Sequence, residues 1–546
     1  MADISQPPSR VSAPIPWLEV IALLAAWAGI TAITVHWLGQ NHAPLSFDQS
    51  HHFLLSLGYR DILADPLRWP GLCSYAIYYP PLFHTSLAAM MLIGGVSLQY
   101  APLINSFWLL MLMLPTWLLG REAFGRAAGL AGALLLALIP ASAGLAREVL
   151  MEVCLAAMVA WAVWALGQSQ GLSRRKWLLV LGALAGLGML AKWTFAMYLL
   201  GPLAWCLYTG HRQGLAVDWR GVAWGLVIGA AVCLPWYLHS PATLIKNMML
   251  NAGQVALKEG DPAVFSWDGL LYYPLSLVNH QMFLPLAILV VVGLAAGLVW
   301  RRERSALPMV WFLSGLVLIT LLRNKDSRYL YPLLAPACLF AVGWAETLSR
   351  RWLRLLLLAA VLALAALHFG AVSYAWGPLA KERVWWVGGK PLRISGPKTV
   401  YARHPSSHDW QLNAILRAAR ADWLRKQRPP RLGVVASLTY FNKKALESWA
   451  AAHGDRVCVV SVVEPTHWRP GRVERDMQRD LSGMDYLVTK TGDLGLDPDY
   501  LRVHNVAQKA LLPKARLVKE FPMPDGGVAG LWRLVNDPGR SVPPCD

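Results

Sequence analysis

The sequence contains few charged residues and lacks the signatures of common soluble enzymes. Of its 546 residues, 15% are Asp, Glu, Lys or Arg and 56% are hydrophobic, which is too apolar for one soluble core. It has no P-loop, no GxSxG and no convincing internal repeat, and the stretch 491–495 lacks the third glycine of a dinucleotide fingerprint. These absences, together with a mean hydropathy of +0.40, indicate a membrane protein.

Cysteine is also scarce, and its spacing gives no metal site. The seven cysteines show no CxxC or CxH pattern, and their usage does not decide the redox compartment. His51, His52, His84 and His280 suggest a metal, but their spacing is not the i,i+4 spacing of ligands on a helix. No metal ligands are therefore assigned, no cofactor is certain, and a requirement for a divalent metal is left open.

Long hydrophobic runs, in contrast, are abundant. The first, Pro16 to Trp37, lacks the short core and cleavage site of a secretory signal, so we expect it to be retained. By the length of a membrane-crossing helix we expect about eleven spans. They are 17–38, 102–119, 126–143, 150–168, 176–191, 193–208, 219–238, 279–300, 306–322, 328–347 and 352–374.

The distribution of cations predicts an orientation. With a cytoplasmic N-terminus, five basic clusters all fall on the cytoplasmic side, as the positive-inside rule requires. They contain Arg121 and Arg126, Arg174 to Lys176, Arg212 and Arg220, Arg301 to Arg304, and Arg350 to Arg354. This topology requires that the apolar stretch 82–96 lies at or dips into the outer surface. The net charge of +18 then favours contact with anionic lipid, and nucleic acid is not an expected partner.

The chain changes character after Tyr374. The apolar runs 432–436, 457–463, 485–489 and 531–535 are short enough for buried strands, and they alternate with helix-like stretches at 413–427 and 441–453. We therefore expect a polytopic α-helical membrane domain over 1–374, including a first outer loop at 39–101, and a small outer α/β domain over 375–546.

Polar residues gather in the segments that this topology places outside. The first loop carries Asp48 in Ser46–His52 and Tyr79 in the Tyr78–His84 segment, the second outer turn carries Arg147, Glu148 and Glu152, and a later turn carries Lys192. His280 lies near the outer end of the eighth span, and Arg323, Lys325, Arg328 and Tyr331 lie at the start of the tenth. Acids and cations collected at one membrane face indicate a polar or anionic ligand.

The order of these motifs resembles the GT-C membrane glycosyltransferases. They look like the branch of protein O-mannosyltransferases and aminoarabinose lipid A transferases. The features that carry this resemblance are an acid in a large first outer loop, Tyr78-Tyr79-Pro80-Pro81-Leu82, the Arg147 to Glu152 step, the Lys192 turn, Arg328-Tyr329-Leu330-Tyr331-Pro332 and a trailing soluble domain. The resemblance covers roughly 17–374. It departs from many relatives at Gln49, where they have Glu, and at the second acid, where Asp is commoner.

The resemblance implies an inverting transferase that takes a sugar from a polyprenyl-phosphate donor to an unknown acceptor at the outer membrane face. Asp48 then matches the catalytic acid of the first loop, and Glu152 or Glu148 matches the second acid. Such transfer needs a base near the incoming nucleophile and cations near the leaving phosphate. Lys192, Arg323, Lys325 and Arg328 are the cations we assign, and His280, Arg147, Tyr79 and Tyr331 complete the expected substrate contacts.

Each assignment has a structural alternative. Asp48 would otherwise cap a helix, Glu148 or Glu152 would pair with Arg147, and the cations would be membrane anchors. At the level of function, the alternatives are a transporter or flippase for a lipid-linked or anionic solute and a membrane-tethered sensor. The charges cluster at span ends and no symmetry relates the two halves, which disfavours a transporter. The composition fits a bacterial inner membrane, with the active site and C-terminal domain periplasmic.

Overall fold

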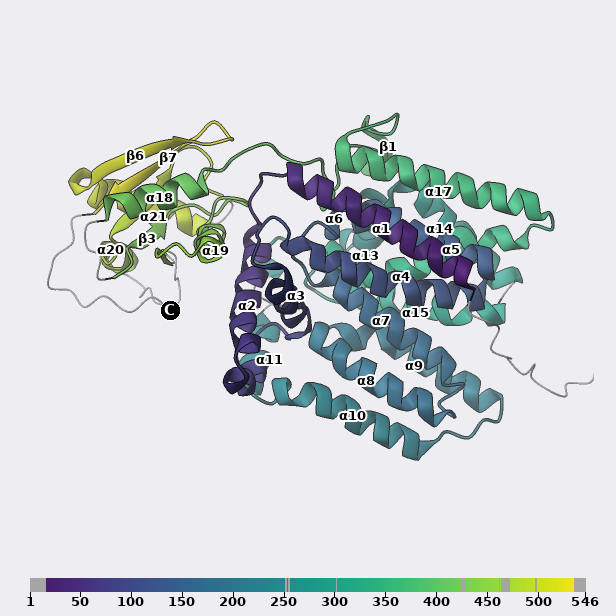
Figure 1. The fold of residues 1–546 in the computed structure, drawn as a ribbon. Coiled ribbons are helices and arrows are strands. Elements are labelled where there is room, and N and C mark those ends of the chain that lie inside the picture. Colours follow the sequence, from purple (N-terminus) through teal and green to yellow (C-terminus); the bar gives the residue numbers. More distant parts are fainter. Residues whose placement is uncertain are drawn as a thin grey trace, which may run out of the picture.

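The computed structural model describes residues 16–250, 253, 256–300, 302–423, 428–460, 462, 472–495 and 498–534. A helical body is joined to a smaller body that contains a sheet (Figure 1). The helices of the first body are α1 (Trp17–Gln40), α2 (Phe47–Ala64), η1 (Pro66–Cys73), α3 (Leu82–Gly94), η2 (Ala101–Leu103), α4 (Ile104–Ala123), α5 (Arg126–Leu138), α6 (Pro140–Leu145), α7 (Glu152–Gln168), α8 (Arg175–Ala191), α9 (Phe195–Arg212), α10 (Trp219–Tyr237), α11 (Pro241–Leu250), α12 (Ala256–Lys258), α13 (Trp267–Ser276), η4 (Leu277–Met282), α14 (Phe283–Trp300), α15 (Arg302–Thr320), η5 (Ser327–Leu333), α16 (Leu334–Gly343), η6 (Trp344–Thr347) and α17 (Arg351–Tyr374).

A helix or a run of helices lies at each of the expected spans. In the described part of the chain, six helical runs are long and apolar enough to cross a membrane. They are 17–40, 101–123, 219–237, 267–299, 327–347 and 351–374. The stretch expected at the outer surface forms α3, a shorter apolar helix of 13 residues, a length more typical of a re-entrant or surface helix than of a span. Arg301, part of one expected basic cluster, lies outside the described residues.

The expected first outer loop is largely helical, which corrects the interpretation of Ser46–His52 as a loop. Ser46 has extended backbone and precedes α2, and Asp48 lies in the first turn of that helix. An acidic side chain in this position is favoured by the partial positive charge of a helix N-terminus. The helix was not predicted because the polar residues of this segment are also typical of a solvated loop.

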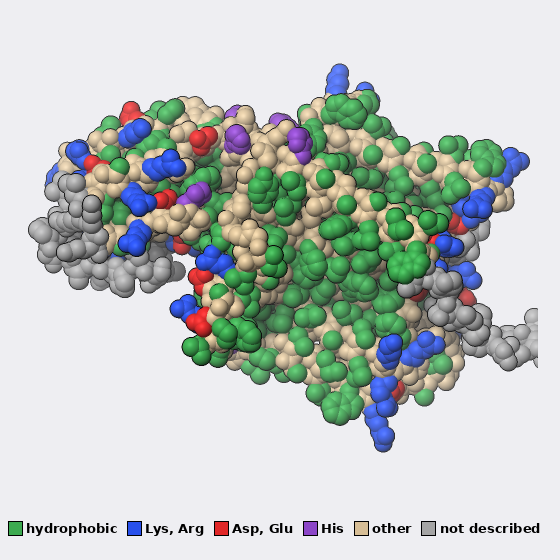
Figure 2. All heavy atoms as spheres, in the orientation of Figure 1, with side chains coloured by type: hydrophobic (Ala, Val, Ile, Leu, Met, Phe, Trp, Pro, Cys, Tyr) green, Lys and Arg blue, Asp and Glu red, His purple; other side chains and the backbone are tan. Residues whose placement is uncertain are grey.

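The surface of the helical body has separate charged and apolar regions. Figure 2 shows lysines and arginines gathered at the end of the body farthest from the C-terminal domain, with a mostly hydrophobic surface between. Large apolar side chains that are exposed on the helical body include Leu18, Ile21, Leu226 and Val291. This pattern is the one expected of a lipid-facing belt with cations at one membrane surface.

The C-terminal body contains a five-stranded sheet covered on both faces. Its elements are α18 (Leu412–Asp422), β3 (Arg431–Val434), α19 (Lys443–His453), β4 (Cys458–Val460), α20 (Val473–Ser482), β5 (Tyr486–Lys490), α21 (Pro498–Ala510), η8 (Leu512–Lys514), β6 (Arg516–Pro522) and β7 (Val528–Arg533). The strand order is β4-β3-β5-β7-β6, in which β3 pairs in parallel with β4 and β5, and β7 is antiparallel to β5 and β6. One apolar core packs α18 and α19 against the sheet, and a second packs α20 and α21 against it.

The expected α/β character of the tail is therefore confirmed, with differences in detail. The strand β6 and a separate hairpin, β1 (Arg383–Val387) with β2 (Lys390–Ser395), were not predicted. The predicted helix 413–427 ends at Asp422, and its last four residues lie outside the described part of the chain. The predicted strands 457–463 and 531–535 also extend into residues outside it, at positions 461, 463 and 535.

Side-chain and backbone contacts attach the C-terminal body to the end of α1 and to α2. The indole of Trp37 donates to the Arg403 carbonyl at 3.1 Å, and the His42 amide donates to the Ser406 carbonyl at 2.7 Å. The Ser448 hydroxyl on α19 lies 3.3 Å from the Ser50 hydroxyl on α2. The sheet domain thus rests on the helix that carries Asp48.

Candidate active site

Asp48 meets a cation from a distant part of the chain. Its carboxylate accepts a hydrogen bond from Nη1 of Arg328 at 3.2 Å, although the two residues are 280 positions apart. The Asp48 side chain is 45% exposed. It therefore keeps an accessible oxygen while one contact fixes its direction, as a proton acceptor for an incoming substrate requires.

Arg328 is held in place by Asp326. Asp326 caps η5 by accepting from the Arg328 backbone amide at 2.8 Å, and its other oxygen accepts from Nε of the same residue at 2.6 Å. Burial opposes ionisation of Asp326, but the Arg328 guanidinium outweighs burial and lowers the pKa of that carboxyl. The result is a planar cation fixed between two carboxylates.

Glu152 and Lys192 form a second pair beside the first. Lys192 follows the end of α8 and donates to Oε1 of Glu152, the first residue of α7, at 3.0 Å. Both side chains are largely buried, and the Lys192 ammonium lies 5.2 Å from the centre of the Tyr329 ring. Oε2 of Glu152 has no hydrogen-bond partner among the described residues. Glu152 thus pairs with Lys192 and not with Arg147, which was the structural alternative.

These two pairs line one cavity of about 210 Å³. Its walls include six residues that the sequence assigned to the site: Asp48, Tyr79, Glu152, Lys192, Arg323 and Arg328. They also include residues that the sequence analysis missed, namely His52, Tyr78, Asn324, Asp326 and Tyr329. Asp326 was detectable, because an Asp immediately before a helical segment is a frequent cap.

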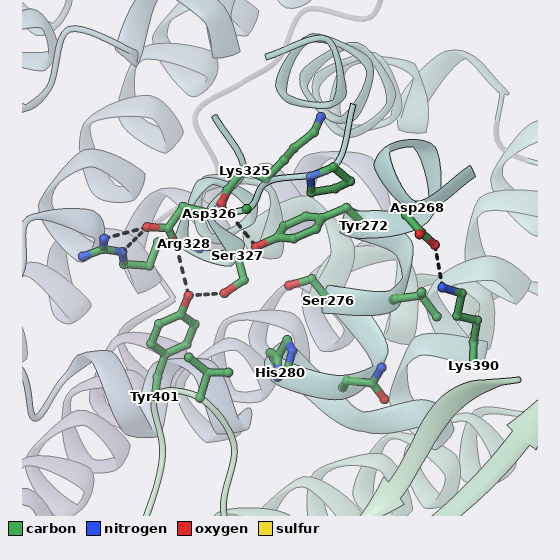
Figure 3. A pocket seen from close by; sticks show the side chains of 15 residues that line it. Asp268, Tyr272, Ser276, His280, Lys325, Asp326, Ser327, Arg328, Lys390 and Tyr401 are labelled. Atoms are coloured by element: carbon green, nitrogen blue, oxygen red, sulfur yellow. Dashed lines mark hydrogen bonds and ion pairs between the residues drawn. The ribbon is translucent and has the colours of Figure 1, made fainter. Parts of the chain in front are cut away.

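A larger cavity of about 750 Å³ is also lined by the Asp326 and Arg328 pair (Figure 3). It contains the predicted residues His280 and Lys325, and it shares Asp326 and Arg328 with the smaller cavity. Tyr401, from the segment that leads to the C-terminal domain, hydrogen-bonds Ser327 and lies 3.3 Å from Asp326. The shared pair therefore forms part of the wall of both cavities.

Lys325 is a cation without a carboxylate ion pair among the described residues. Its ammonium donates to the Thr320 carbonyl and lies 5.5 Å from the centre of the Tyr273 ring. Burial lowers the pKa of this amine. A buried ammonium in the wall of a cavity is a suitable partner for an anionic group that enters it.

Two histidines form a directed chain of hydrogen bonds next to the smaller cavity. Nδ1 of His84 lies 3.2 Å from the Pro80 carbonyl oxygen, which can only accept a hydrogen bond, so the proton of the His84 ring is on Nδ1. Nε2 of His84 is then an acceptor, and it accepts a hydrogen bond from Nδ1 of His52 at 3.0 Å. Burial lowers the pKa of His84 to about 3 and that of His52 well below its usual value. His52 is therefore neutral, and its Nε2 is left as an acceptor.

Three predicted site residues lie elsewhere. Arg147 stacks on Trp37 and Phe369, donates to the Ser373 hydroxyl at 2.8 Å, and lines a third cavity of about 580 Å³ beside the C-terminal domain. Tyr331 is fully buried, with its hydroxyl 3.0 Å from that of Ser142. Glu148 lines neither of the two cavities that meet at Arg328. Sequence order placed these residues near the site but did not show which way their side chains point.

Three carboxylates of the site are paired with cations. Among the residues that the structure describes, no three His, Cys, Asp or Glu side chains are arranged to hold a metal ion. Asp48 and Asp326 contact Arg328, and Glu152 contacts Lys192. We therefore assign no residue to a metal.

Comparison with known proteins agrees with this architecture. The model of the family described as dolichyl-phosphate-mannose-protein mannosyltransferase matches residues 79–239. The crystal structure of ArnT from Cupriavidus metallidurans bound to undecaprenyl phosphate is similar with a TM-score of 0.60 and 16% identity, over 95% of this chain and 98% of that one. The chain has the GT-C fold.

Other similar structures belong to the same class. Apo ArnT from Cupriavidus metallidurans matches with a TM-score of 0.54 and 15% identity, over 94% of this chain and 97% of that one. Arabinofuranosyltransferase AftD from Mycobacteria matches with a TM-score of 0.50 and 16% identity, over 94% of this chain and 41% of the other. No curated protein sequence matches the chain significantly. The resemblance to GT-C glycosyltransferases drawn from the motifs is thus confirmed, and nothing in these comparisons supports a transporter.

Proposed function

We propose that the protein transfers a sugar from a polyprenyl-phosphate donor to a nucleophile, with inversion, at the outer face of a bacterial inner membrane. The observation that carries this proposal is the position of Arg328 in the wall of both cavities, with Asp48 hydrogen-bonded to it in the wall of the smaller one. The larger cavity would take the donor and the smaller one the acceptor, with the cation Arg328 between them and the base Asp48 on the acceptor side. The family match and the ArnT complex with undecaprenyl phosphate support the donor class.

The larger cavity suits the phosphate of the donor. Lys325 and Arg328 lie in its walls together with Lys390 and His280. When the sugar leaves, the phosphodiester becomes a monoester and gains negative charge, which the cations Lys325, Arg328 and Lys390 would stabilise more strongly in the transition state than in the ground state. Arg328 is prearranged for this task because Asp326 fixes its guanidinium.

Asp48 would act as the general base. In the proposed reaction the acceptor oxygen or nitrogen forms a bond to C1 of the sugar while the bond from C1 to the phosphate oxygen breaks. The proton of the acceptor passes to the Asp48 carboxylate, and the phosphate leaves with the electron pair. A single displacement of this kind inverts the configuration at C1, and a base contributes about two to four orders of magnitude.

Three observations support an outer, oxidising location for the site and the C-terminal domain. Basic clusters lie at the far end of the helical body (Figure 2), as expected for a cytoplasmic surface. The C-terminal domain lies at the opposite end (Figure 1). Cys458 in that domain is disulfide-bonded, and disulfides persist mainly in oxidising compartments.

The proposal is tested with membranes that contain the protein. Polyprenyl-phosphate donors carrying different radiolabelled sugars are supplied, and label is measured in protein, lipid and polysaccharide fractions. We expect transfer from at least one donor into one fraction, with no transfer in membranes that lack the protein. Absence of transfer from every polyprenyl-phosphate sugar, with the protein folded and present, would contradict the proposal.

A further inference from the structure

The hairpin β1–β2 stands apart from the sheet of the C-terminal domain. Figure 1 shows it projecting from the helical body beside α17. Its strands are antiparallel, with Val387 opposite Lys390, and the two intervening glycines have φ values of 55° and 75°. Positive φ at both central residues defines a type I′ turn, which glycine forms without strain.

Large apolar side chains are exposed on both faces of this hairpin. Trp385 is 59% exposed, Trp386 is 64% exposed and Val387 is 48% exposed. Consecutive residues of a strand point to opposite faces, so the two indoles extend in different directions. A two-stranded hairpin of this kind is only marginally stable in water unless something packs against it.

The inner strand of the hairpin is fixed to the helical body. The amide of the Asn279 side chain donates to the Pro391 carbonyl at 2.9 Å, and its oxygen accepts from the Arg393 backbone amide at 2.8 Å. The Lys390 ammonium lies 2.5 Å from the Asp268 carboxylate (Figure 3). Because β2 is held by these contacts, β1 with its tryptophans is the outward strand.

The surface that continues from the hairpin is apolar. Exposed side chains of the neighbouring helices α13 and α14 include Leu270, Ile288 and Val291, and Trp267 is 79% exposed next to Asp268. Cations surround the hairpin, since Lys381, Arg383 and Lys398 are all exposed. Tryptophan above an apolar helical belt, with Lys and Arg beside it, is typical of the boundary between lipid tails and headgroups.

We propose that the β1–β2 hairpin is immersed in the headgroup region of the outer leaflet, with Trp385, Trp386 and Val387 in contact with lipid. The exposure of both faces supports a lipid environment, because an immersed hairpin contacts lipid on every side, whereas a protein partner would cover one face. The cations around it fit anionic phosphate headgroups.

The hairpin also forms part of the larger cavity. Lys390, Asp268 and Asn279, which join the hairpin to the helices, line that cavity together with Arg328. A lipid phosphate that leaves the bilayer at the hairpin would therefore pass Lys390 before it reaches Arg328. This step deepens the proposed function, on which it rests, by assigning the side from which the donor phosphate approaches.

Immersion is tested by quenching with brominated lipid. Trp386→Cys and Trp385→Cys are each labelled with an environment-sensitive fluorophore, in a protein whose partly exposed Cys73 and Cys233 are replaced by Ser. The proteins are reconstituted in vesicles with or without brominated phosphatidylcholine. We expect about twofold or stronger quenching at both positions, as for groups that lie in the headgroup and acyl boundary.

Leu517→Cys provides the matched control, because Leu517 is 41% exposed on β6 of the C-terminal sheet. It should be quenched little. Quenching at 385 and 386 no stronger than at 517 would overturn the proposal. Quenching at one of the two positions alone would also overturn it, since that result indicates a face turned to protein or water.

A second measurement addresses the approach of the donor. The double variant Trp385→Ser/Trp386→Ser should raise the apparent KM for a long-chain polyprenyl donor in vesicles and leave the rate with a short-chain prenyl donor added from water unchanged. Equal effects on both donors would contradict the route past Lys390. If the unmodified protein transfers no sugar from either donor, the proposed function fails, while the quenching result still decides whether the hairpin is immersed.

Discussion

Arg328 contacts two carboxylates with different parts of one guanidinium. Nε and Nη2 face Asp326, and Nη1 faces Asp48. A lysine at this position offers a compact ammonium that cannot reproduce this fork. In the proposed reaction, Arg328 would therefore both position Asp48 and stabilise the leaving phosphate.

We predict that Arg328→Lys impairs transfer and that Arg328→Ala impairs it more. Loss of a charge-assisted hydrogen bond costs about 1.5–3 kcal/mol, which corresponds to roughly a ten- to hundredfold loss of rate at subsaturating donor. Arg323→Lys is the matched control, because Arg323 lines the same cavity and has no such fork in the described structure. Wild-type activity of Arg328→Lys would show that Arg328 is only an anchor.

Glu148 gives a prediction about pH. Although part of its surface is exposed, its carboxyl is densely surrounded by protein, and burial raises its pKa to about 7. The folded state therefore holds this proton over a pH range in which the unfolded state has lost it. It follows that stability decreases as the pH rises from about 4.5 to about 7.

Glu148→Gln should remove this part of the pH dependence. Thermal unfolding of the detergent-solubilised protein, measured between pH 4.5 and 7.5, should show a smaller decrease in Tm with rising pH than in the unmodified protein. Asp61→Asn, a change at an exposed acid on α2, serves as the control. Identical pH profiles for Glu148→Gln and the unmodified protein would contradict burial of this carboxyl.

At the scale of elements, the Glu152 and Lys192 pair connects the beginning of α7 to the end of α8. Removing one partner of a buried pair leaves an uncompensated charge, which costs about 3–5 kcal/mol, whereas replacing both partners is far less costly. We predict that Lys192→Met lowers the stability in detergent strongly and that Glu152→Gln/Lys192→Met restores most of it. A double variant as unstable as the single one would show that the pair does not join the two helices.

The sequence predicted those helices and strands that have a clear hydrophobic pattern within their own residues. Apolar runs located the helices of the first body, and short β-branched runs located β3 and β5. It missed α2, whose exposed and site-facing polar residues resemble a loop, and β6, where Arg516, Lys519 and Glu520 interrupt the apolar pattern. The hairpin was detectable from Gly388-Gly389 between two strand-like runs. The contacts of Asp48 with Arg328 and of His52 with His84 could not be predicted from the sequence, because folding brings together residues that are far apart in it.

At the scale of the whole molecule, we propose that the C-terminal domain and Asp48 lie on one side of the membrane and the basic turns on the other. We predict that cysteines introduced at Leu67 and Leu517 react from outside with a membrane-impermeant thiol reagent and that one at Arg174 does not. All three positions are exposed in the structure, so access is decided by the membrane alone. Labelling at Arg174 in intact cells would overturn the orientation and with it the outer location of the site.

The central claim is that Asp48 is the base for sugar transfer from a polyprenyl-phosphate donor. Its most direct test is the initial transfer rate of Asp48→Asn, with Asp61→Asn on the same helix as the control. The amide keeps the shape of the carboxylate but cannot take the proton. We predict a loss of about two to four orders of magnitude with donor binding retained, and an unchanged rate for Asp61→Asn. A rate for Asp48→Asn above about a tenth of the unmodified protein's, well short of the loss expected for a base, would contradict the mechanism.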